Sequence, residues 1–321
     1  MSAGLITIAY GPRKYVRMAE ALARSYRRWN PELPICVVTD RANADRLSAC
    51  YDIVRLIEPA YGKGVAQKLC VDRYSPFDET LFVDSDCVFY HDPMRAWHAY
   101  ATGDFVIKGW KYLTRQDRHV NVGNLGLLLE QTGLERMGSF NSGLFYFRRS
   151  EQAQRLFDTA RAVYERRADL AFKPFKNAPV AHEPVLAIAM ELCGIGFSPW
   201  DPKNGMETWI SMRGMQSVNV LKANSRVTKH GEVLEPAVIH YNVDGQISLA
   251  YLRDIFRLAY EHQPQGELRA HLLAACFRSW YVLQKKRSRL AEMATNFLAA
   301  RAYPARLRTQ RTPASAVAAR R

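Results

Sequence analysis

No apolar run in this 321-residue sequence approaches the roughly 20 residues that a helix needs to cross a bilayer. The first apolar segment covers residues 5–10, and neither a charged leader nor a long apolar core precedes it. The sequence therefore shows no secretory signal, and we expect a cytoplasmic protein.

Paired cysteines are also missing. The sequence has no C-x-x-C motif among its six cysteines, which are Cys36, Cys50, Cys70, Cys87, Cys193 and Cys276. Several of them lie inside apolar runs, where buried side chains are expected. We therefore predict reduced, buried thiols and no zinc site built from cysteine.

Acidic residues are scarce at the C-terminal end. Residues 263–321 contain twelve Lys and Arg against two acids, Glu267 and Glu292, so this segment carries +10 of the net charge of +14. The other +4 belongs to residues 1–262, too little for a nucleic-acid-binding surface, and no specific nucleic acid is expected. The asymmetry instead indicates an anionic neighbour for the C-terminal segment, either a membrane surface or a polyanion.

The rest of the composition is that of an ordinary globular protein, with 48% hydrophobic and 24% charged residues. Residues 5–10 and 35–39 have the pattern of buried strands, and residues 15–26 between them have a helical period. This order predicts a parallel β-α-β unit and hence an α/β fold. Further strands are expected at residues 53–57, 80–83, 87–90, 105–107, 144–147 and 237–241, and further helices at residues 64–74, 152–167 and 183–193.

The pattern changes near residue 263. Residues 263–300 alternate apolar and basic side chains at near-helical spacing, which predicts a basic amphipathic helical extension of one or two helices. Residues 301–321 contain six arginines, two prolines and no acid, which is typical of a disordered tail. The sequence thus divides into a main α/β domain (1–262), the extension and the tail. The extension either lies on an anionic membrane or packs on the sheet of the main domain with a solvated basic face.

The clearest candidate site is Asp84-Ser85-Asp86, directly after the buried strand at residues 80–83. Carboxylates at positions i and i+2 of an extended chain point the same way and can reach one hard cation. Such a cation can clamp a diphosphate and stabilise a leaving nucleotide. A bare D-x-D triplet is also a common solvated turn, so the motif alone does not decide between the two.

Residues 81–89 (LFVDSDCVF) resemble the metal-binding segment of GT-A glycosyltransferases, and more narrowly the retaining family that includes glycogenin and bacterial lipopolysaccharide galactosyltransferases. Further blocks in the order of that family are Lys68, residues 140–144 (FNSGL), residues 182–186 (HEPVL) and residues 239–241 (IHY). The resemblance covers roughly residues 5–245. It implies a GT-A fold, a Rossmann-like, mixed and mostly parallel sheet flanked by helices.

The resemblance also assigns a metal site and a donor site. Asp84, Asp86 and His240 become the metal ligands, a set that suits Mn²⁺ better than Mg²⁺. Lys68, Asp84 and Ser85 would contact the donor. On its own, His240 would be interpreted as a core histidine, and Lys68 as a solvated helix lysine.

Four residues would surround the reacting sugar. Asn141 and Ser142 would line the sugar and acceptor pocket, although Asn-Ser-Gly also favours a simple turn. His182 and Glu183 would lie beside the reacting carbon, although the same residues suit a helix N-terminus. Both interpretations can hold together for the second pair.

Three residues at strand ends are candidates for the base and ribose. Tyr10 and Gly11 follow the first strand and Asp40 follows the second, where an open α/β sheet binds nucleotides. Tyr10 would stack on the base and Asp40 would accept a hydrogen bond. The alternative for each is a residue that only ends its strand and begins the next loop.

The sequence departs from the family after His240. The retaining group carries a lysine in a G-x-x-K-P-W stretch, whereas residues 242–249 contain Gly245 and no lysine. Lys108, Lys222 or Lys229 would then have to neutralise the phosphate, or the metal would do more. An inverting enzyme would instead use Glu183 or Asp244 as general base.

The function expected from the sequence is transfer of a hexose from a nucleotide-sugar, with UDP-sugars first, to a hydroxyl of a glycan or lipid-linked glycan. The transfer would be assisted by Mn²⁺ or Mg²⁺ and would retain configuration, with an inverting enzyme as the alternative. A sugar nucleotidyltransferase is a further alternative, although the first strand lacks its glycine-rich basic loop. The last alternative is a protein whose basic tail binds nucleic acid or membrane.

Overall fold

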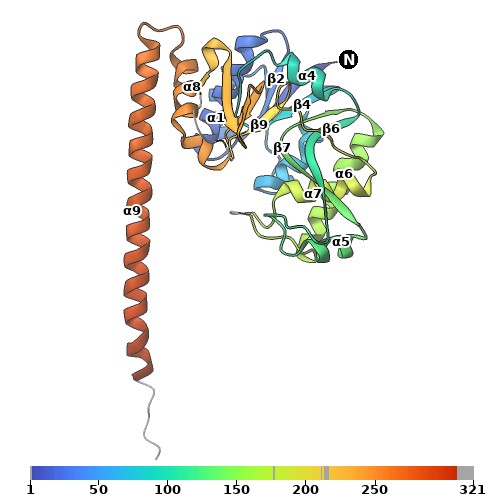
Figure 1. Ribbon diagram of the computed structural model, residues 1–321, viewed down its shortest axis with the longest axis vertical. Helices are drawn as coiled ribbons and strands as arrows, with labels where there is room; N and C mark the ends of the chain where they lie inside the picture. Colours follow the sequence, from blue (N-terminus) through green and yellow to red (C-terminus); the bar gives the residue numbers. More distant parts are fainter. Residues whose placement is uncertain (1, 176–177, 211, 213–216, 309–321) are drawn as a thin grey trace, which may run out of the picture.

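The computed structural model describes residues 2–175, 178–210, 212 and 217–308 (Figure 1). Its centre is a seven-stranded sheet in the order β3-β2-β1-β4-β7-β6-β8. The strands are β1 (Ala3–Ile8), β2 (Ile35–Thr39), β3 (Ile53–Leu56), β4 (Glu79–Val83), β6 (Phe105–Thr114), β7 (Arg136–Arg148) and β8 (Ser198–Pro199). All neighbours run parallel except β7, which is antiparallel to both β4 and β6. The expected mixed, mostly parallel sheet is thus confirmed.

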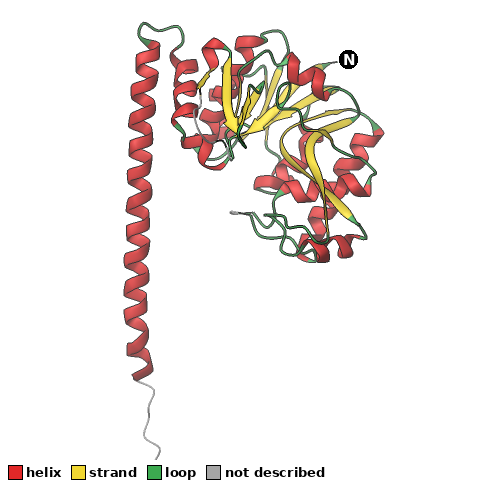
Figure 2. Cartoon of the chain, in the orientation of Figure 1, coloured by secondary structure: helices red, strands yellow, loops and turns green. Residues whose placement is uncertain are grey.

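Helices cover both faces of this sheet (Figure 2). Successive residues of β4 point to opposite faces of the sheet, and each face has its own hydrophobic core. Leu81 packs in the first core and Phe82 in the second. The first core is covered by α1 (Arg13–Trp29) and α4 (Met94–Tyr100), and the second by α5 (Leu125–Thr132), α6 (Glu151–Glu165) and α7 (His182–Leu192). The remaining short helices before α7 are α2 (Arg41–Ser48), α3 (Val71–Tyr74), η1 (Pro59–Tyr61), η2 (Gly64–Cys70) and η3 (Arg166–Ala168).

A small second sheet positions the late histidine. It has the order β5-β13-β9, formed by β5 (Cys87–Phe89), β13 (Val238–His240) and β9 (Met206–Thr208). In its register His240 lies opposite Cys87, and Tyr241 N donates to Asp86 O at 2.9 Å. Strand pairing therefore places His240 beside the Asp84-Ser85-Asp86 turn, about 150 residues away in sequence.

The C-terminal region begins with a third sheet of β10 (Ser217–Asn219), β11 (Asn224–Lys229) and β12 (Glu232–Leu234), with η4 (Val220–Lys222) between its first two strands. It continues as η5 (Val243–Ile247), α8 (Leu249–Tyr260) and the long helix α9 (Gly266–Arg308). The start of α9 packs on α8, and the rest projects away from the body (Figure 1).

The domain boundary expected after residue 262 lies in the link between α8 and α9. The boundary expected at residue 300 lies inside α9, which runs as one helix to Arg308. Residues 309–321, the rest of the expected disordered tail, lie outside the described residues.

Two local expectations were wrong. Asn141-Ser142-Gly143 is not a turn before a strand, the alternative given for it, but lies inside β7, between the residues that pair with β6 alone and those that pair with β4. All six cysteines are free, as expected, but only three of them are buried. Cys50 and Cys193 are half-buried, and Cys276 is exposed on α9.

Candidate active site

The Asp84-Ser85-Asp86 turn joins β4 to β5, and β7 holds it in place. Asp84 N donates to Gly143 O at 2.8 Å, which extends the β4–β7 ladder by one residue beyond Val83. Ser85 is buried, whereas the carboxylates keep 28% and 14% of their side chains exposed. The two carboxylates therefore combine a fixed backbone with access from outside.

His240 faces both carboxylates through one ring nitrogen. Its Nε2 lies 3.1 Å from Asp86 Oδ1 and 3.7 Å from Asp84 Oδ2. Its Nδ1 lies 2.9 Å from Asn141 Oδ1, an oxygen that can only accept, so Nδ1 carries the proton. In the neutral ring the lone pair of Nε2 then points toward the carboxylates, as a metal-ligating histidine requires.

Gly143 makes room for this histidine. A Cβ atom at this position would lie 2.4 Å from His240 Nδ1 and 2.9 Å from Asn141 Oδ1. Gly143 N also donates to Asn141 Oδ1 at 2.9 Å, which fixes the amide that holds the ring. The glycine in the FNSG block is thus explained by close packing against His240 and not by a turn.

Asp86 is held on both oxygens. Gln246, from η5, donates through Nε2 to Asp86 Oδ2 at 2.7 Å. Burial raises the pKa of Asp86, but the charge of His240 and the hydrogen bonds from His240 and Gln246 outweigh it and bring the pKa to about 2. Burial lowers the pKa of His240, and the charge and hydrogen bond of Asp86 more than offset this, so its pKa is raised. The site therefore favours positive charge between these carboxylates.

Lys68 supplies a cation that contacts both oxygens of Asp84. Its Nζ donates to Asp84 Oδ1 at 2.9 Å and Oδ2 at 3.0 Å, and to Ser142 Oγ at 3.5 Å. It also lies 4.6 Å from the centre of the Phe82 ring. Only 8% of Lys68 is exposed, so it is not a solvated helix lysine.

His182 and Glu183 begin α7 and meet β7 at Ser142. His182 Nε2 lies 2.5 Å from Ser142 Oγ, and Glu183 Oε1 accepts from Ser142 N at 3.2 Å. Burial lowers the pKa of His182 well below its usual value, with further lowering by Lys68 and His240, so the ring is neutral. Burial raises the pKa of Glu183, against the opposing effects of Ser142 N, Lys68 and His240. The pair brings a neutral imidazole and a weakened acid to the same edge of the sheet.

Tyr10, Gly11 and Asp40 have local partners. Asp40 caps α2 by accepting from Asn43 N at 3.1 Å, and its other oxygen accepts from Gly11 N at 2.6 Å. The hydroxyl of Tyr10 accepts from Gly64 N at 2.7 Å. These contacts join the loop after β1 to the start of α2 and to the first residue of η2.

The remaining candidates, three lysines and Asp244, lie in different surroundings. Lys229 is buried and committed to Glu207 and Thr208, with Nζ 2.9 Å from Thr208 Oγ1, so it is not free to neutralise a phosphate. Lys108 lies 5.2 Å from the centre of the Tyr100 ring. Lys222 ends η4, and Asp244 lies in η5, where its side chain is outside the described residues.

The sequence analysis did not identify Gln246 as part of the site. Gln246 lies in the stretch where the family's lysine is missing, and this missing lysine was the only sign in the sequence that the stretch differs.

The ligand atoms of Asp86, Cys87 and His240 lie within 4.8 Å of one another, as metal ligands could. Burial raises the pKa of the Cys87 thiol well above its usual value, so it stays protonated and is a poor ligand. Asp84 is the better third ligand for a hard cation.

No family model matches this chain, and no curated protein matches it. The bifunctional glycosyltransferase WbbM matches with 13% identity and a TM-score of 0.51, over 84% of this chain and 51% of WbbM. An active-site mutant of LgtC matches with 14% identity and a TM-score of 0.50, over 84% of this chain and 99% of LgtC. The glycosyltransferase GlyE of Streptococcus pneumoniae has a TM-score of 0.42 and 13% identity, and the match spans 63% of this chain and 46% of GlyE.

The chain thus spans about half the length of WbbM and GlyE, and nearly all of LgtC. At these identities the likeness to WbbM and LgtC establishes the fold. The GT-A fold expected from the sequence is confirmed.

Proposed function

We propose that this protein is a metal-dependent glycosyltransferase that moves a hexose from a nucleotide-sugar donor to a hydroxyl of a glycan or lipid-linked glycan. UDP-sugars are the first candidates for the donor. The observation that carries the proposal is the position of His240 Nε2, 3.1 Å from Asp86 Oδ1 and 3.7 Å from Asp84 Oδ2. It supports a three-ligand site on a fold that glycosyltransferases use.

Asp84, Asp86 and His240 would hold Mn²⁺, or Mg²⁺ as the second choice, since one imidazole with two carboxylates suits Mn²⁺. The fixed tautomer of His240, which leaves the lone pair of Nε2 toward the carboxylates, fits such an ion. When bound, the ion supplies positive charge to the donor diphosphate and its leaving group.

Lys68 and β7 would bind and orient the donor. Lys68 is already close to Asp84 and Ser142, so its ammonium can turn from Asp84 to a donor phosphate or sugar hydroxyl. Asn141 and Ser142 would line the sugar and acceptor pocket. Tyr10, Gly11, Asp40 and Ser85 would complete the nucleotide side at the strand ends.

Two groups are candidates to take the proton of the acceptor hydroxyl, the leaving phosphate and a carboxylate. In the retaining reaction, which we propose first, the acceptor attacks on the face that the phosphate leaves and the phosphate takes the proton. In the inverting alternative Glu183 takes it, and its raised pKa suits a general base near neutral pH. Asp244 is the second candidate for that base, and His182 would hold the Ser142 hydroxyl in position.

The test is a donor-hydrolysis screen across UDP-, GDP- and CMP-sugars, each with Mn²⁺ and with EDTA. We expect one donor class to be hydrolysed with Mn²⁺ and not with EDTA. The anomeric configuration of the product, followed by NMR, then separates retention from inversion. Failure to bind or cleave any donor would count against the proposal.

We further propose that α9 contacts an anionic membrane surface, where a lipid-linked acceptor would lie. Leu268, Leu272, Trp280 and Leu283 recur at helical spacing on α9, and each is more than half exposed. Basic residues lie between them, as in helices that lie in a membrane interface. None of the helices in the described part of the chain combines the length and apolar character that a bilayer crossing requires.

A further inference from the structure

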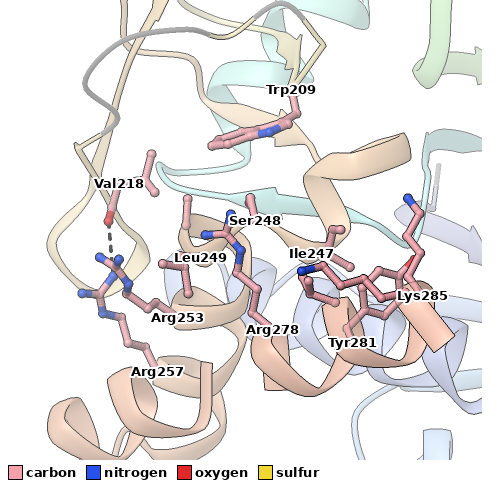
Figure 3. Close-up of a pocket in the computed structure, with 13 residues that line it drawn as sticks. Trp209, Val218, Ile247, Ser248, Leu249, Arg253, Arg257, Arg278, Tyr281 and Lys285 are labelled. Carbon is pink, nitrogen blue, oxygen red and sulfur yellow. Dashed lines mark hydrogen bonds between the residues drawn. The ribbon is translucent and has the colours of Figure 1, made fainter. Parts of the chain in front are cut away.

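A cavity of about 700 Å³ lies between η5, the start of α8 and the first half of α9 (Figure 3). Trp209 forms one wall, and Tyr281 and Lys285 of α9 lie across from it. The volume is within the range of small-molecule sites. Because α9 closes one side, the cavity exists only while this helix is packed on α8.

The cavity is strongly cationic. Arg253, Arg278, Lys285 and Lys286 line it, and none of its lining residues is acidic. None of these four has an ion-pair partner within the described part of the chain. Arg257 also lines it but is different, because it is bound to Asp254 and Glu267.

The N-terminus of α8 adds to this charge. Ser248 and Leu249 line the cavity, and α8 begins at Leu249. A helix of this length carries partial positive charge at its N-terminus, where anions bind. The dipole and the unpaired cations therefore favour the same kind of ligand, one with concentrated negative charge.

The cavity is joined to the candidate active site through two contacts. Gln246, which holds Asp86 at 2.7 Å, directly precedes the lining residue Ile247. Trp209 N donates to His240 O at 2.9 Å, and the Trp209 ring stacks on Tyr241 with 4.9 Å between ring centres. A ligand in the cavity would therefore contact the segments that hold Asp86 and His240.

We propose that this cavity binds a phosphate or diphosphate group carried by the acceptor. Guanidinium groups bind phosphate oxygens in pairs, which fits Arg253 and Arg278, and the Trp209 ring offers a surface for an attached sugar or apolar chain. The donor's own diphosphate would be met outside the cavity, by Lys68 and the metal ligands, none of which lines it. The assignment to the acceptor rests on the proposed transferase function, whereas anion binding by the cavity does not.

The test is calorimetric titration of the full chain with inorganic pyrophosphate in EDTA, which keeps metal ions out of the measurement. The variant Arg253→Ala/Arg278→Ala should weaken binding by about tenfold or more, because two charge-assisted contacts are lost. The matched control is Arg118→Ala/Arg287→Ala, which removes the same charge from exposed arginines outside the cavity. It should bind pyrophosphate as the parent chain does.

Equal weakening in both double variants, or none in either, would overturn the cavity site. The two proposals fail separately, because donor hydrolysis reports on the metal site and pyrophosphate binding on the cavity. Two further arms identify the source of the anion, one with a soluble sugar 1-phosphate and one with phosphatidylcholine vesicles containing a polyprenyl diphosphate. Binding that is weakened in Arg253→Ala/Arg278→Ala in either arm supports the proposal, and binding that this variant leaves unchanged in both arms contradicts it.

Discussion

At the scale of single residues, three neighbours on β7 explain how a histidine from β13 is aimed. Asn141 holds His240 Nδ1, Ser142 meets α7 through His182 and Glu183, and Gly143 leaves space for the ring. Strand alternation alone cannot place these contacts, because each depends on a segment distant in sequence.

Replacing Gly143 with Ala should displace His240. The new methyl group would lie 2.4 Å from His240 Nδ1, a clash in a packed site, so we expect a loss of about 1–3 kcal/mol in the free energy of unfolding. Metal affinity should fall as well, because Nε2 moves away from the carboxylates. Denaturant unfolding and a Mn²⁺ titration measure the two effects.

The control for that variant is Gly103→Ala, whose new atom would meet Val106 at an ordinary 3.4 Å. This variant should change the free energy of unfolding and the Mn²⁺ affinity little. If Gly143→Ala matched this control, close packing against His240 would not be the reason for the glycine.

The raised pKa of Glu183 predicts that the stability of the folded chain depends on pH. Its pKa in the folded chain is raised by burial, so the folded state holds this proton more tightly than the unfolded chain does, whose pKa is about 4.3. Its contribution to stability therefore falls as the pH rises from about 4.3 through the folded pKa. The variant Glu183→Gln should gain stability relative to the parent over that range, measured by urea unfolding at several pH values. A difference that stays constant with pH would contradict the raised pKa.

Much of the candidate site could be predicted from the sequence through the family resemblance, and some of it could not. Asp84, Asp86, Lys68 and His240 are brought together as the resemblance implied. Gln246 could not be predicted, because an amide in a short 3₁₀ helix has no sequence pattern of its own. Whether the assembled residues have the proposed roles stays a prediction.

At the scale of elements, the apolar runs located the strands of the core but not their full length. The run at residues 144–147 marks only the end of β7, which begins at Arg136. Its first half pairs with the second half of β6, where buried residues such as Leu113 and Met137 are separated by exposed ones such as Lys111 and Thr114. This stretch has no continuous apolar run, so a search for such runs could not show the extension.

A buried network of charged residues holds helix α8, and it predicts a loss of stability when Arg257 is replaced. Arg257 donates to Asp254 at 2.7 Å and binds Glu267 of α9, and Asp254 is fully buried. Arg257→Met would leave that carboxylate without its cation, so we expect a loss of about 3–5 kcal/mol in the free energy of unfolding.

The matched change on the same helix is Arg253→Met, which breaks no ion pair and should cost no more than about 0.5 kcal/mol. Thermal unfolding of both variants checks this. Equal stability of the two would contradict a structural role for the Arg257 network.

At the scale of the whole molecule, the charge asymmetry of the sequence corresponds to one long projecting helix (Figure 1). If α9 contacts membranes, the full chain should float with vesicles that contain phosphatidylserine, and high salt should weaken this. A chain ending at residue 277 should float less. Equal flotation of both chains would remove the membrane proposal, and the cytoplasmic location predicted from the sequence is a separate prediction.

The central claim is that Asp84, Asp86 and His240 hold a metal ion on which sugar transfer depends. Its most direct test is a Mn²⁺ titration of donor hydrolysis after treatment with EDTA, in the parent chain, in Asp86→Asn and in the exposed control Asp45→Asn. The account predicts that Mn²⁺ restores hydrolysis in the parent and the control, and that Asp86→Asn stays inactive at concentrations that saturate both. The same Mn²⁺ dependence in Asp86→Asn as in the parent would contradict it.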